Sequence, residues 1–317
     1  MIAVVERANF QTAADLFHSW QDDLLSNKPP VFYPIGTGDL ASLEVGPGLV
    51  TLFGGAPGAG KTAFVMQAVV DALRLTPDLT ALVCNVEMAP KVLLDRQFSR
   101  LSGIDLETVR YRRFGAEHAE RMQQGLATIE SFAARLCFVR PPFSLENVAA
   151  CADACHADLL LLDYLQRISP PGEHGDNRSA VNATMGYLRQ FADDERAVLV
   201  VSAVGRTKDS RGRASYDGES LNLASFRESS ELEFGADDAF MLVKDSANEQ
   251  QVTLRHLKSR HGRAHDRTLR FWGDFQRFES PPTDSAPGGS SGLNTALAAM
   301  WDRTSAAPED DSAEVSE

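Results

Sequence analysis

The stretch GAPGAGKT, from Gly55 to Thr62, matches the pattern G-x-x-x-x-G-K-[ST] of phosphate-binding loops. A short apolar run of strand type, residues 49–53, comes before it, and an apolar segment without a helix breaker follows it as far as Pro77. In this order of strand, glycine loop and helix, backbone N–H groups can surround phosphate oxygens at the positive end of the helix. A chance match in a glycine-rich linker is the alternative, and the flanking strand and helix disfavour it.

The loop assigns roles to its side chains as well as to its backbone. We expect Lys61 to reach the β- and γ-phosphates of a nucleotide and the Thr62 hydroxyl to bind Mg²⁺. The predicted nucleotide-binding residues are Gly55, Ala56, Pro57, Gly58, Ala59, Gly60, Lys61 and Thr62.

The composition is that of an ordinary α/β protein. With 317 residues, 43% hydrophobic and 24% charged, the chain suits one large domain with tails. We find no apolar run long enough to span a bilayer, and Glu6 and Arg7 interrupt the N-terminus before a signal-peptide core could form. We therefore expect a cytoplasmic protein that does not enter a membrane.

The four cysteines do not have the spacing of a metal site. Cys84 and Cys137 lie in apolar, strand-like runs, and Cys151 and Cys155 are one helical turn apart beside His156. A structural metal would need further ligands at suitable spacing. We therefore expect buried thiols in a reducing compartment.

Two flanking segments differ from the rest of the chain. Residues 1–30 carry apolar side chains at three- and four-residue spacing, which predicts an amphipathic linker helix ending near Asn27. This helix could pack on its own domain or on a neighbouring subunit, and both readings stay open. Residues 281–317 are rich in Ser, Gly, Ala and Pro and hold seven acidic groups and one basic group, which predicts a disordered acidic tail.

The segment between them, residues 31–280, alternates strand and helix patterns. Strands are predicted at 49–54, 81–87, 136–140, 158–163, 197–204, 240–244, 251–258 and 268–272, and helices at 61–75, 90–102, 117–133, 144–156 and 178–194. Such alternation predicts an α/β fold with a mainly parallel, twisted sheet flanked by helices. The last strands follow one another without helices, so we expect an antiparallel extension at one edge.

Two acidic residues end predicted strands on the side where such sheets bind ligands. Asp163 ends a run of four leucines and is expected to hold Mg²⁺, usually through water; capping of the next turn is the alternative. Glu87 ends the strand 81–87 and is expected to orient and polarise the water that attacks the nucleotide. Capping of the helix that begins near Pro90 is the alternative for Glu87.

Six motifs together resemble a known family. The order GAPGAGKT, NVEM, LLLLDYLQRI, VLVVSAVGR, FRESSELEFGAD and KSRHG is similar to the C-terminal motor domain of DnaB-type replicative helicases, in the RecA-like P-loop ATPase superfamily. Those helicases carry GK[ST], LEM, DYLQ, SQLNR, LRESGSIEQDAD and KQRNG in that order. The resemblance covers roughly residues 31–279. It implies a RecA-like P-loop NTPase core, ATP and Mg²⁺ as cofactors, and an ATP-dependent DNA helicase that works as a homo-oligomer, most simply a hexamer.

The resemblance also implies roles for single residues. Lys61 and Thr62 bind phosphate and Mg²⁺, Glu87 is the catalytic base, and Asp163 lies on the Mg²⁺ side. Lys258 and Arg260 match a Lys-x-Arg pair that enters the active site of the adjacent subunit. An arginine finger of this kind is worth ~10³–10⁵ in rate, and its supply in trans requires a ring or filament. A solvated strand end is the alternative for this pair.

The expected surface for single-stranded DNA is a loop region that begins at Arg206. Basic residues without a hydrophobic period suit backbone phosphates, although an ordinary solvated loop stays open as the alternative. The net charge of −13 usually argues against nucleic acid, but it does not exclude a basic loop inside a ring. The predicted DNA-binding residues are Arg206, Lys208, Arg211 and Arg213, with Arg227 and Glu228 from the Arg-Glu pair that the family uses to follow the strand.

Two departures from the family weaken the reading of a processive motor. Ala203 stands where the family has the glutamine of SQLNR, so no side chain there can sense the γ-phosphate. About thirty residues stand where the family has a collar domain that recruits primase, so contact with a replication or recombination partner would fall to the N-terminal helix or the acidic tail. The alternative function is a RecA-like or KaiC-like ATPase switch, such as a recombination mediator or loader. A non-hydrolysing assembly protein is a third reading, which the intact Lys61, Glu87 and Asp163 disfavour.

Overall fold

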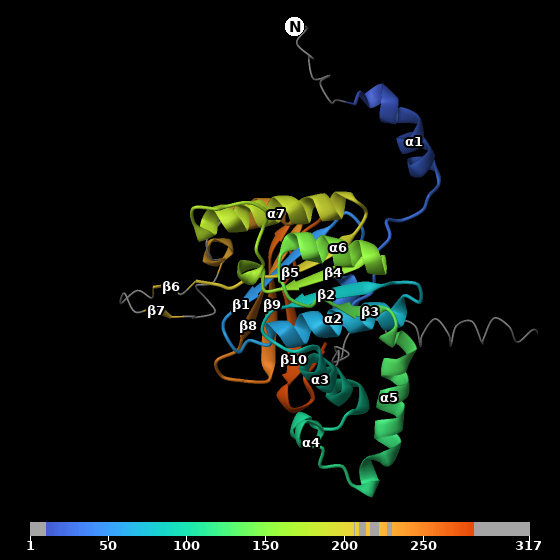
Figure 1. The fold of residues 1–317 in the computed structure, drawn as a ribbon, viewed down its shortest axis with the longest axis vertical. Helices are drawn as coiled ribbons and strands as arrows, with labels where there is room; N and C mark the ends of the chain where they lie inside the picture. The colour runs from blue at the N-terminus through green and yellow to red at the C-terminus, as the bar shows by residue number, and fades with distance from the viewer. Residues whose placement is uncertain (1–10, 206, 209–213, 216–221, 227–229, 282–317) are drawn as a thin grey trace, which may run out of the picture.

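A nine-stranded sheet organises the chain, with helices on both of its faces (Figure 1). The structure is a computed structural model that describes residues 11–205, 207–208, 214–215, 222–226 and 230–281. The strand order is β11-β10-β9-β8-β1-β5-β4-β2-β3. Neighbours from β3 to β8 pair in parallel, and β8 to β11 pair antiparallel. The predicted α/β fold, a mainly parallel sheet flanked by helices with an antiparallel extension at one edge, is thus confirmed.

The parallel strands are β1 (Val50–Gly55), β2 (Ala81–Asn85), β3 (Leu136–Phe138), β4 (Leu159–Asp163), β5 (Ala197–Val201) and β8 (Asp238–Lys244). The antiparallel extension consists of β9 (Gln251–Ser259), β10 (Arg267–Trp272) and β11 (Arg277–Glu279). Two short strands, β6 (Thr207–Lys208) and β7 (Ala214–Ser215), form a separate pair.

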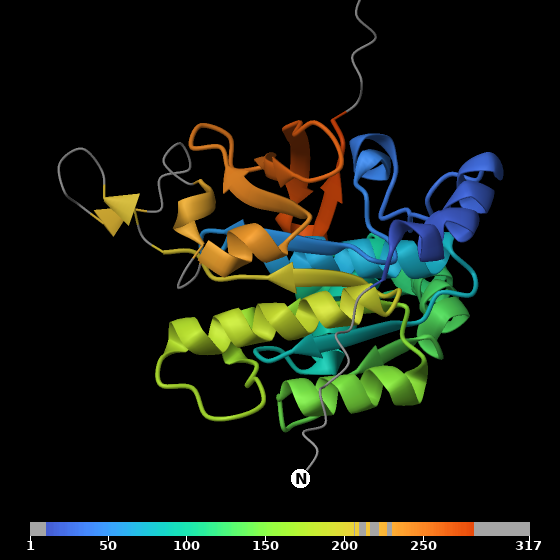
Figure 2. The ribbon, with the colours of Figure 1, turned by 90° about the horizontal axis from the view of Figure 1, so that it is seen from above.

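The helices are α1 (Ala13–Leu25), α2 (Lys61–Leu75), α3 (Pro90–Ser102), α4 (Leu106–Tyr111), α5 (Ala119–Ala133), α6 (Leu145–Cys155), α7 (Asn177–Asp193) and α8 (Ser230–Gly235). Figure 2 shows α6 and α7 against one face of the sheet, with α2 on the other. Short 3₁₀ turns occur at Gly38–Ser42, Ala116–His118, Leu165–Arg167, Leu223–Ser225 and Gly273–Phe275.

Strand β4 shows why both faces of the sheet need cover. Its side chains alternate, so Leu159 and Leu161 join the core on the α2 side, whereas Leu160 and Leu162 join the core on the α6–α7 side. All four are at most 1% exposed. A continuous apolar strand is typical of a parallel sheet buried on both faces. Polar chemistry is therefore confined to the strand ends.

Several details differ from the sequence-based expectation. Strand β2 ends at Asn85 rather than Glu87, because the Asn85 side chain accepts hydrogen bonds from the N–H groups of Glu87 and Met88 and turns the chain. The six-residue helices α4 and α8 and the three-residue strand β11 were not predicted. All three are too short to show a clear hydrophobic period.

Helix α1 lies apart from the sheet (Figure 1). A capping box between Thr12 and Asp15 starts it, and it ends at Leu25, two residues before the predicted end. It has no buried residue, and the Trp20 side chain is 56% exposed. The helix therefore buries none of its side chains against the described part of its own chain, and docking on a neighbouring subunit stays a prediction. The predicted acidic tail after Pro281 lies outside the described residues.

Only one of the four cysteines is fully buried, although all four were expected to be. Cys84 is buried, while Cys137, Cys151 and Cys155 are partly buried against the core on the α6–α7 side. Burial raises the pKa of the Cys84 thiol to about 12 and that of Cys155 to about 11, so both are neutral at pH 7. Within the described ranges we find no group of three or more His, Cys, Asp or Glu that could hold a metal, and no helix long and apolar enough to cross a membrane.

Candidate active site

The glycine loop joins the end of β1 to the start of α2, as the sequence predicts. Gly60 caps the helix with a φ of 91°, in the left-handed region that favours glycine, and a Cβ there would lie 2.9 Å from the Phe278 ring. The Lys61 ammonium donates to the carbonyl oxygens of Gly55 (2.8 Å) and Ala56 (3.0 Å). The Lys61 side chain thus spans the loop whose bound phosphates it is predicted to contact.

Three polar side chains from neighbouring elements meet beside this loop. The Thr62 hydroxyl donates to Asp163 Oδ2 at 2.7 Å, and the Asn85 amide donates to the same oxygen at 2.8 Å. Asn85 and Asp163 are register partners at the ends of β2 and β4, so the sheet itself holds them together. A hydroxyl and a carboxylate at this spacing are the hard oxygen ligands that Mg²⁺ prefers, and they fit the predicted metal position.

A pocket of about 580 Å³ brings the predicted catalytic residues together. Lys61, Thr62 and Asp163 line it, and Glu87, which is exposed just beyond the end of β2, faces the same space. Further lining comes from residues that the sequence did not single out, namely Met88, Arg96, Tyr164, Val204, Phe271 and Gln276.

Burial perturbs the charged groups in this pocket. Burial raises the pKa of Asp163 above its ordinary value, while the hydrogen bond from Thr62 and the charge of Lys61 act in the opposite direction. Burial likewise lowers the pKa of Lys61, opposed by the charges of Asp163 and Glu87. Perturbed groups gathered in one concave site are typical of active sites.

Asn85 and Arg96 are the site residues that the sequence analysis missed. Arg96 comes from α3 and is half-buried; burial lowers its pKa, and the charge of Asp163 opposes that shift. Arg96 lies on a helix nine residues after Glu87 and belongs to none of the sequence motifs. For Asn85, the available signal was its place at a predicted strand end, two residues before Glu87.

Comparison with known proteins decides the family. A sequence profile described as the DnaB-like helicase C terminal domain matches residues 43–280, most of the chain. The chain belongs to the DnaB-like helicase family. A search of curated proteins finds no match.

Two solved structures show the same fold as this DnaB-like domain. One, described as an ATPase domain, has a TM-score of 0.74 at 17% identity, over 86% of this chain and 100% of that one. The other, a DnaB-like replicative helicase described with its interactions with primase, has a TM-score of 0.71 at 17% identity, over 86% of this chain and 67% of that one.

The Lys-x-Arg pair of the DnaB-like domain lies far from the pocket of its own chain. Lys258 is the register partner of Ala239 near the start of β8, and Asp238 is level with Thr51 near the start of β1. The glycine loop leaves the opposite end of β1, at Gly55. With a rise of ~3.3 Å per residue, most of the length of a strand separates the pair from the loop.

The position of the glutamine in the family's SQLNR motif lies at the pocket, but the residue here has no side chain that can form a hydrogen bond. Ala203 lines the pocket, and its backbone N–H donates to Gln166 Oε1 at 3.1 Å. Gln166 also donates to the Ser202 hydroxyl at 2.8 Å. A neighbouring glutamine therefore fixes the end of this segment, while the Ala203 methyl cannot hydrogen-bond to a phosphate.

The predicted DNA surface falls almost wholly outside the described residues. This holds for Arg206, Arg211, Arg213, Arg227 and Glu228. The backbone of Lys208 lies in β6, which pairs with β7 away from the main sheet (Figure 1). The DNA-binding roles stay predictions.

Proposed function

We propose that this chain is an ATP-dependent DNA helicase that hydrolyses ATP at the interfaces of a homo-oligomeric ring while it binds single-stranded DNA. Membership of the DnaB-like family and the pocket chemistry support ATP hydrolysis. The observation that carries the proposal is the separation of Lys258 and Arg260 from the pocket of their own chain. A finger at the opposite end of the sheet can serve only the site of another copy.

In this proposal each side chain of the pocket has one task. The glycine loop and Lys61 bind the β- and γ-phosphates, and Glu87 orients the attacking water and accepts its proton. Thr62 and Asp163 would hold Mg²⁺, which supplies charge neutralisation between the phosphates when bound. Arg260 of the adjacent copy, with Lys258, stabilises the charge that develops on the γ-phosphoryl oxygens.

Helix α1 supports assembly into an oligomer. Leu16, Phe17, Trp20, Leu24 and Leu25 are between 46% and 68% exposed on a helix with no buried residue. An exposed apolar face of this kind marks an interaction surface, and in the proposed ring a neighbouring copy buries it. A hexamer is the assembly that we propose, with α1 or the acidic tail available to a replication or recombination partner.

A second function, an ATPase switch without processive unwinding, has one observation in its favour. Ala203 lines the pocket without a side chain able to sense the γ-phosphate. In the switch, ATP binding and hydrolysis would control a loader or recombination mediator. Unwinding of forked DNA, measured together with DNA-stimulated turnover, separates the two functions, because the switch does not unwind DNA processively.

The experiment combines DNA stimulation with subunit mixing. We expect single-stranded DNA to raise ATP turnover several-fold and forked DNA to be unwound. Turnover indifferent to DNA would favour the switch. Arg260→Ala and Glu87→Gln should each be inactive alone, and a mixture should regain turnover, because some interfaces then combine an intact pocket with an intact finger. A mixture as inactive as its parts would contradict sites shared between subunits.

A further inference from the structure

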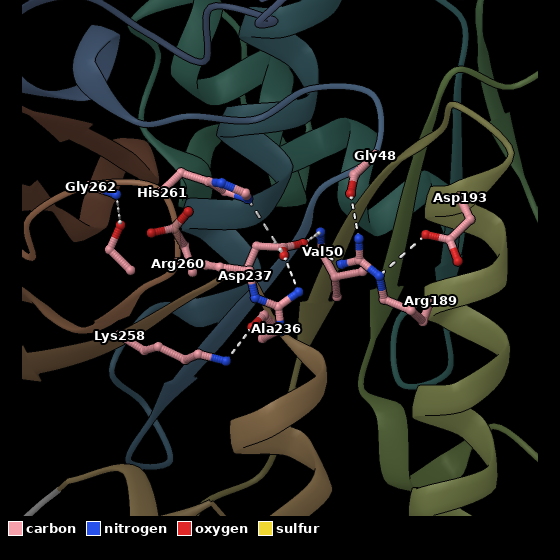
Figure 3. Close-up of polar contacts among 12 residues, drawn as sticks. Gly48, Val50, Arg189, Asp193, Ala236, Asp237, Lys258, Arg260, His261 and Gly262 are labelled. Carbon is pink, nitrogen blue, oxygen red and sulfur yellow. Dashed lines mark hydrogen bonds and ion pairs between the residues drawn. The ribbon is translucent and has the colours of Figure 1, made fainter. Parts of the chain in front are cut away.

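The Arg260 guanidinium is hydrogen-bonded to the end of α8 and to the turn between α8 and β8 (Figure 3). Its Nη1 donates to Asp237 Oδ1 at 2.8 Å, and its Nη2 donates to the Phe234 carbonyl at 2.8 Å. The Arg260 backbone N–H donates to the Asp237 carbonyl at 2.9 Å. The side chain nevertheless stays 42% exposed. Arg260 is therefore fixed along one edge and open along the other.

Asp237 is the centre of this arrangement. Its side chain is 1% exposed, and its Oδ2 accepts from the Val50 N–H at 2.8 Å and from Arg189 Nη1. Arg189 is held in turn by the Gly48 carbonyl at 3.0 Å. A buried carboxylate of this kind is tolerated only when it is paired and hydrogen-bonded. The start of β1 and helix α7 thus brace the group that holds Arg260.

Three cationic side chains lie around Asp237. They are Arg189, Arg260 and Lys258, and the ring nitrogen of His261 lies 3.8 Å from Asp237 Oδ1. Two further carboxylates lie nearby: Asp193 lies 3.4 Å from Arg189, and Asp238 lies 2.7 Å from His256. Because Arg260 shares the Asp237 carboxylate with Arg189, its exposed edge presents positive charge to an anion from outside the chain.

Lys258 follows the same pattern as Arg260. Its ammonium donates to the Ala236 carbonyl at 2.6 Å and to the Phe234 carbonyl at 3.2 Å. Burial, with the nearby charge of Arg260, lowers the pKa of Lys258. Both cations of the Lys-x-Arg pair are anchored on residues 234–237.

We propose that Asp237 is a positioning residue that aims the Arg260 guanidinium at the nucleotide of the neighbouring subunit, with Arg189 keeping the Asp237 carboxylate in place. The inference rests on the proposed function, because Arg260 must act in trans for its aim to matter. A pre-oriented cation stabilises developing charge without reorganisation during the reaction, and a misplacement of about 1 Å can cost ~10²-fold in rate.

The first test compares two neighbouring buried carboxylates. Asp237→Asn keeps the size of the side chain and removes the charge that holds Arg260; Asp238→Asn does the same one residue later, where His256 is the partner. We expect Asp237→Asn to lower kcat by ~10- to 100-fold with little change in the KM for ATP, because its own pocket is intact. Asp238→Asn should keep a kcat near that of the unchanged chain. Melting temperature and native mass of both variants show that they are folded and assembled.

Subunit mixing gives a readout that a purely structural role would not move. Mixed with Glu87→Gln, the Asp237→Asn chain should regain turnover, just as Arg260→Ala does, because the partner then supplies a well-aimed finger. Mixed with Arg260→Ala, it should not. A purely structural defect would not distinguish the two mixtures in this way.

Chemical rescue tests whether Asp237 holds a guanidinium group at this position. Millimolar guanidinium chloride should restore part of the turnover of Arg260→Ala, because Asp237 and the Phe234 carbonyl can hold the free cation. It should not rescue the double variant Arg260→Ala/Asp237→Asn. Should Asp237→Asn fail to fold, Arg189→Gln is the second variant, and the same fall in kcat at constant KM is expected.

The possible failures are distinct. Full turnover by Arg260→Ala would overturn both the trans finger and the positioning role. An inactive Arg260→Ala beside an Asp237→Asn variant as active as Asp238→Asn would overturn the positioning role alone.

Discussion

The two ends of the central sheet differ in how their polar groups are satisfied. At the carboxyl ends of the strands, Lys61, Thr62, Asn85 and Asp163 bond to one another or to the glycine loop within one chain. At the amino ends, Asp237 binds two arginines, and Arg260 stays 42% exposed. The first end resembles a prepared receptor for phosphate and metal, and the second presents a cation for another molecule. In the proposed function, each chain supplies the two complementary halves of sites that it shares with its neighbours.

The largest effect is expected from removing the cation of the receptor end. Lys61→Ala should reduce ATP turnover by roughly 10³-fold, because a charge aimed at the phosphates is lost from a partly buried position. Lys91→Ala is the matched control, since Lys91 is exposed at the start of α3. Steady-state phosphate release measures both variants. An equal loss of ATP turnover in the two variants would contradict the proposal that the pocket around Lys61 binds the phosphates.

The next effect concerns the metal position. Asp163→Asn should reduce turnover by roughly 10²-fold and raise the Mg²⁺ concentration needed for half-maximal rate, because a ligand charge is lost. Asp158→Asn is the control on the same chain segment, as Asp158 lies just before β4, at its amino end, and binds the Thr80 N–H at 2.8 Å. A Mg²⁺ titration of the two variants distinguishes them. An unchanged Mg²⁺ requirement in Asp163→Asn would remove Asp163 from the metal site.

A smaller effect is expected at Asn85, which ties the metal side to the loop bearing Glu87. Asn85→Ala loses the bond to Asp163 and those from the N–H groups of Glu87 and Met88, so it should cost about 1–3 kcal/mol in the free energy of unfolding. Turnover should fall as well, because Glu87 is less well placed. Asn147→Ala, which releases the Arg140 and Pro142 carbonyls elsewhere, should lower stability without touching turnover. Denaturant unfolding and ATPase assays on both variants test this.

The smallest effect is a pH dependence of stability. Because burial raises the pKa of Asp163 in the folded state, the folded protein binds more protons than the unfolded one between the ordinary and the raised pKa. Stability should therefore decline as pH rises from about 4 through the raised pKa, and this decline should be absent in Asp163→Asn. Melting temperatures of the nucleotide-free proteins across this range measure it. A constant difference between the two proteins would contradict the raised pKa.

The candidate site was predictable from the sequence where its residues follow from strand ends and motifs. Glu87 lies two residues beyond the end of β2, and Asp163 ends the neighbouring parallel strand β4. The carboxyl ends of such strands meet at one edge of the sheet, so the pocket of the structure contains both residues. Arg96 was not predicted because a single arginine on an amphipathic helix cannot be distinguished by its spacing from a residue on the solvated face. Helix α4 and strand β11 were not predicted because they are too short to repeat a hydrophobic period often enough to be recognised.

The sequence by itself determined the nucleotide loop, the alternation of strands and helices, and the Lys-x-Arg pair, because these are local patterns set by spacing along the chain. Only the tertiary structure decided that Asn85 joins Asp163, and that Asp237 brings together Val50, Arg189 and Arg260. Those partners are separated by many residues, and the order and register of strands in the sheet set their distances. Local patterns do not contain that register, because it follows from packing both apolar faces of the sheet at once.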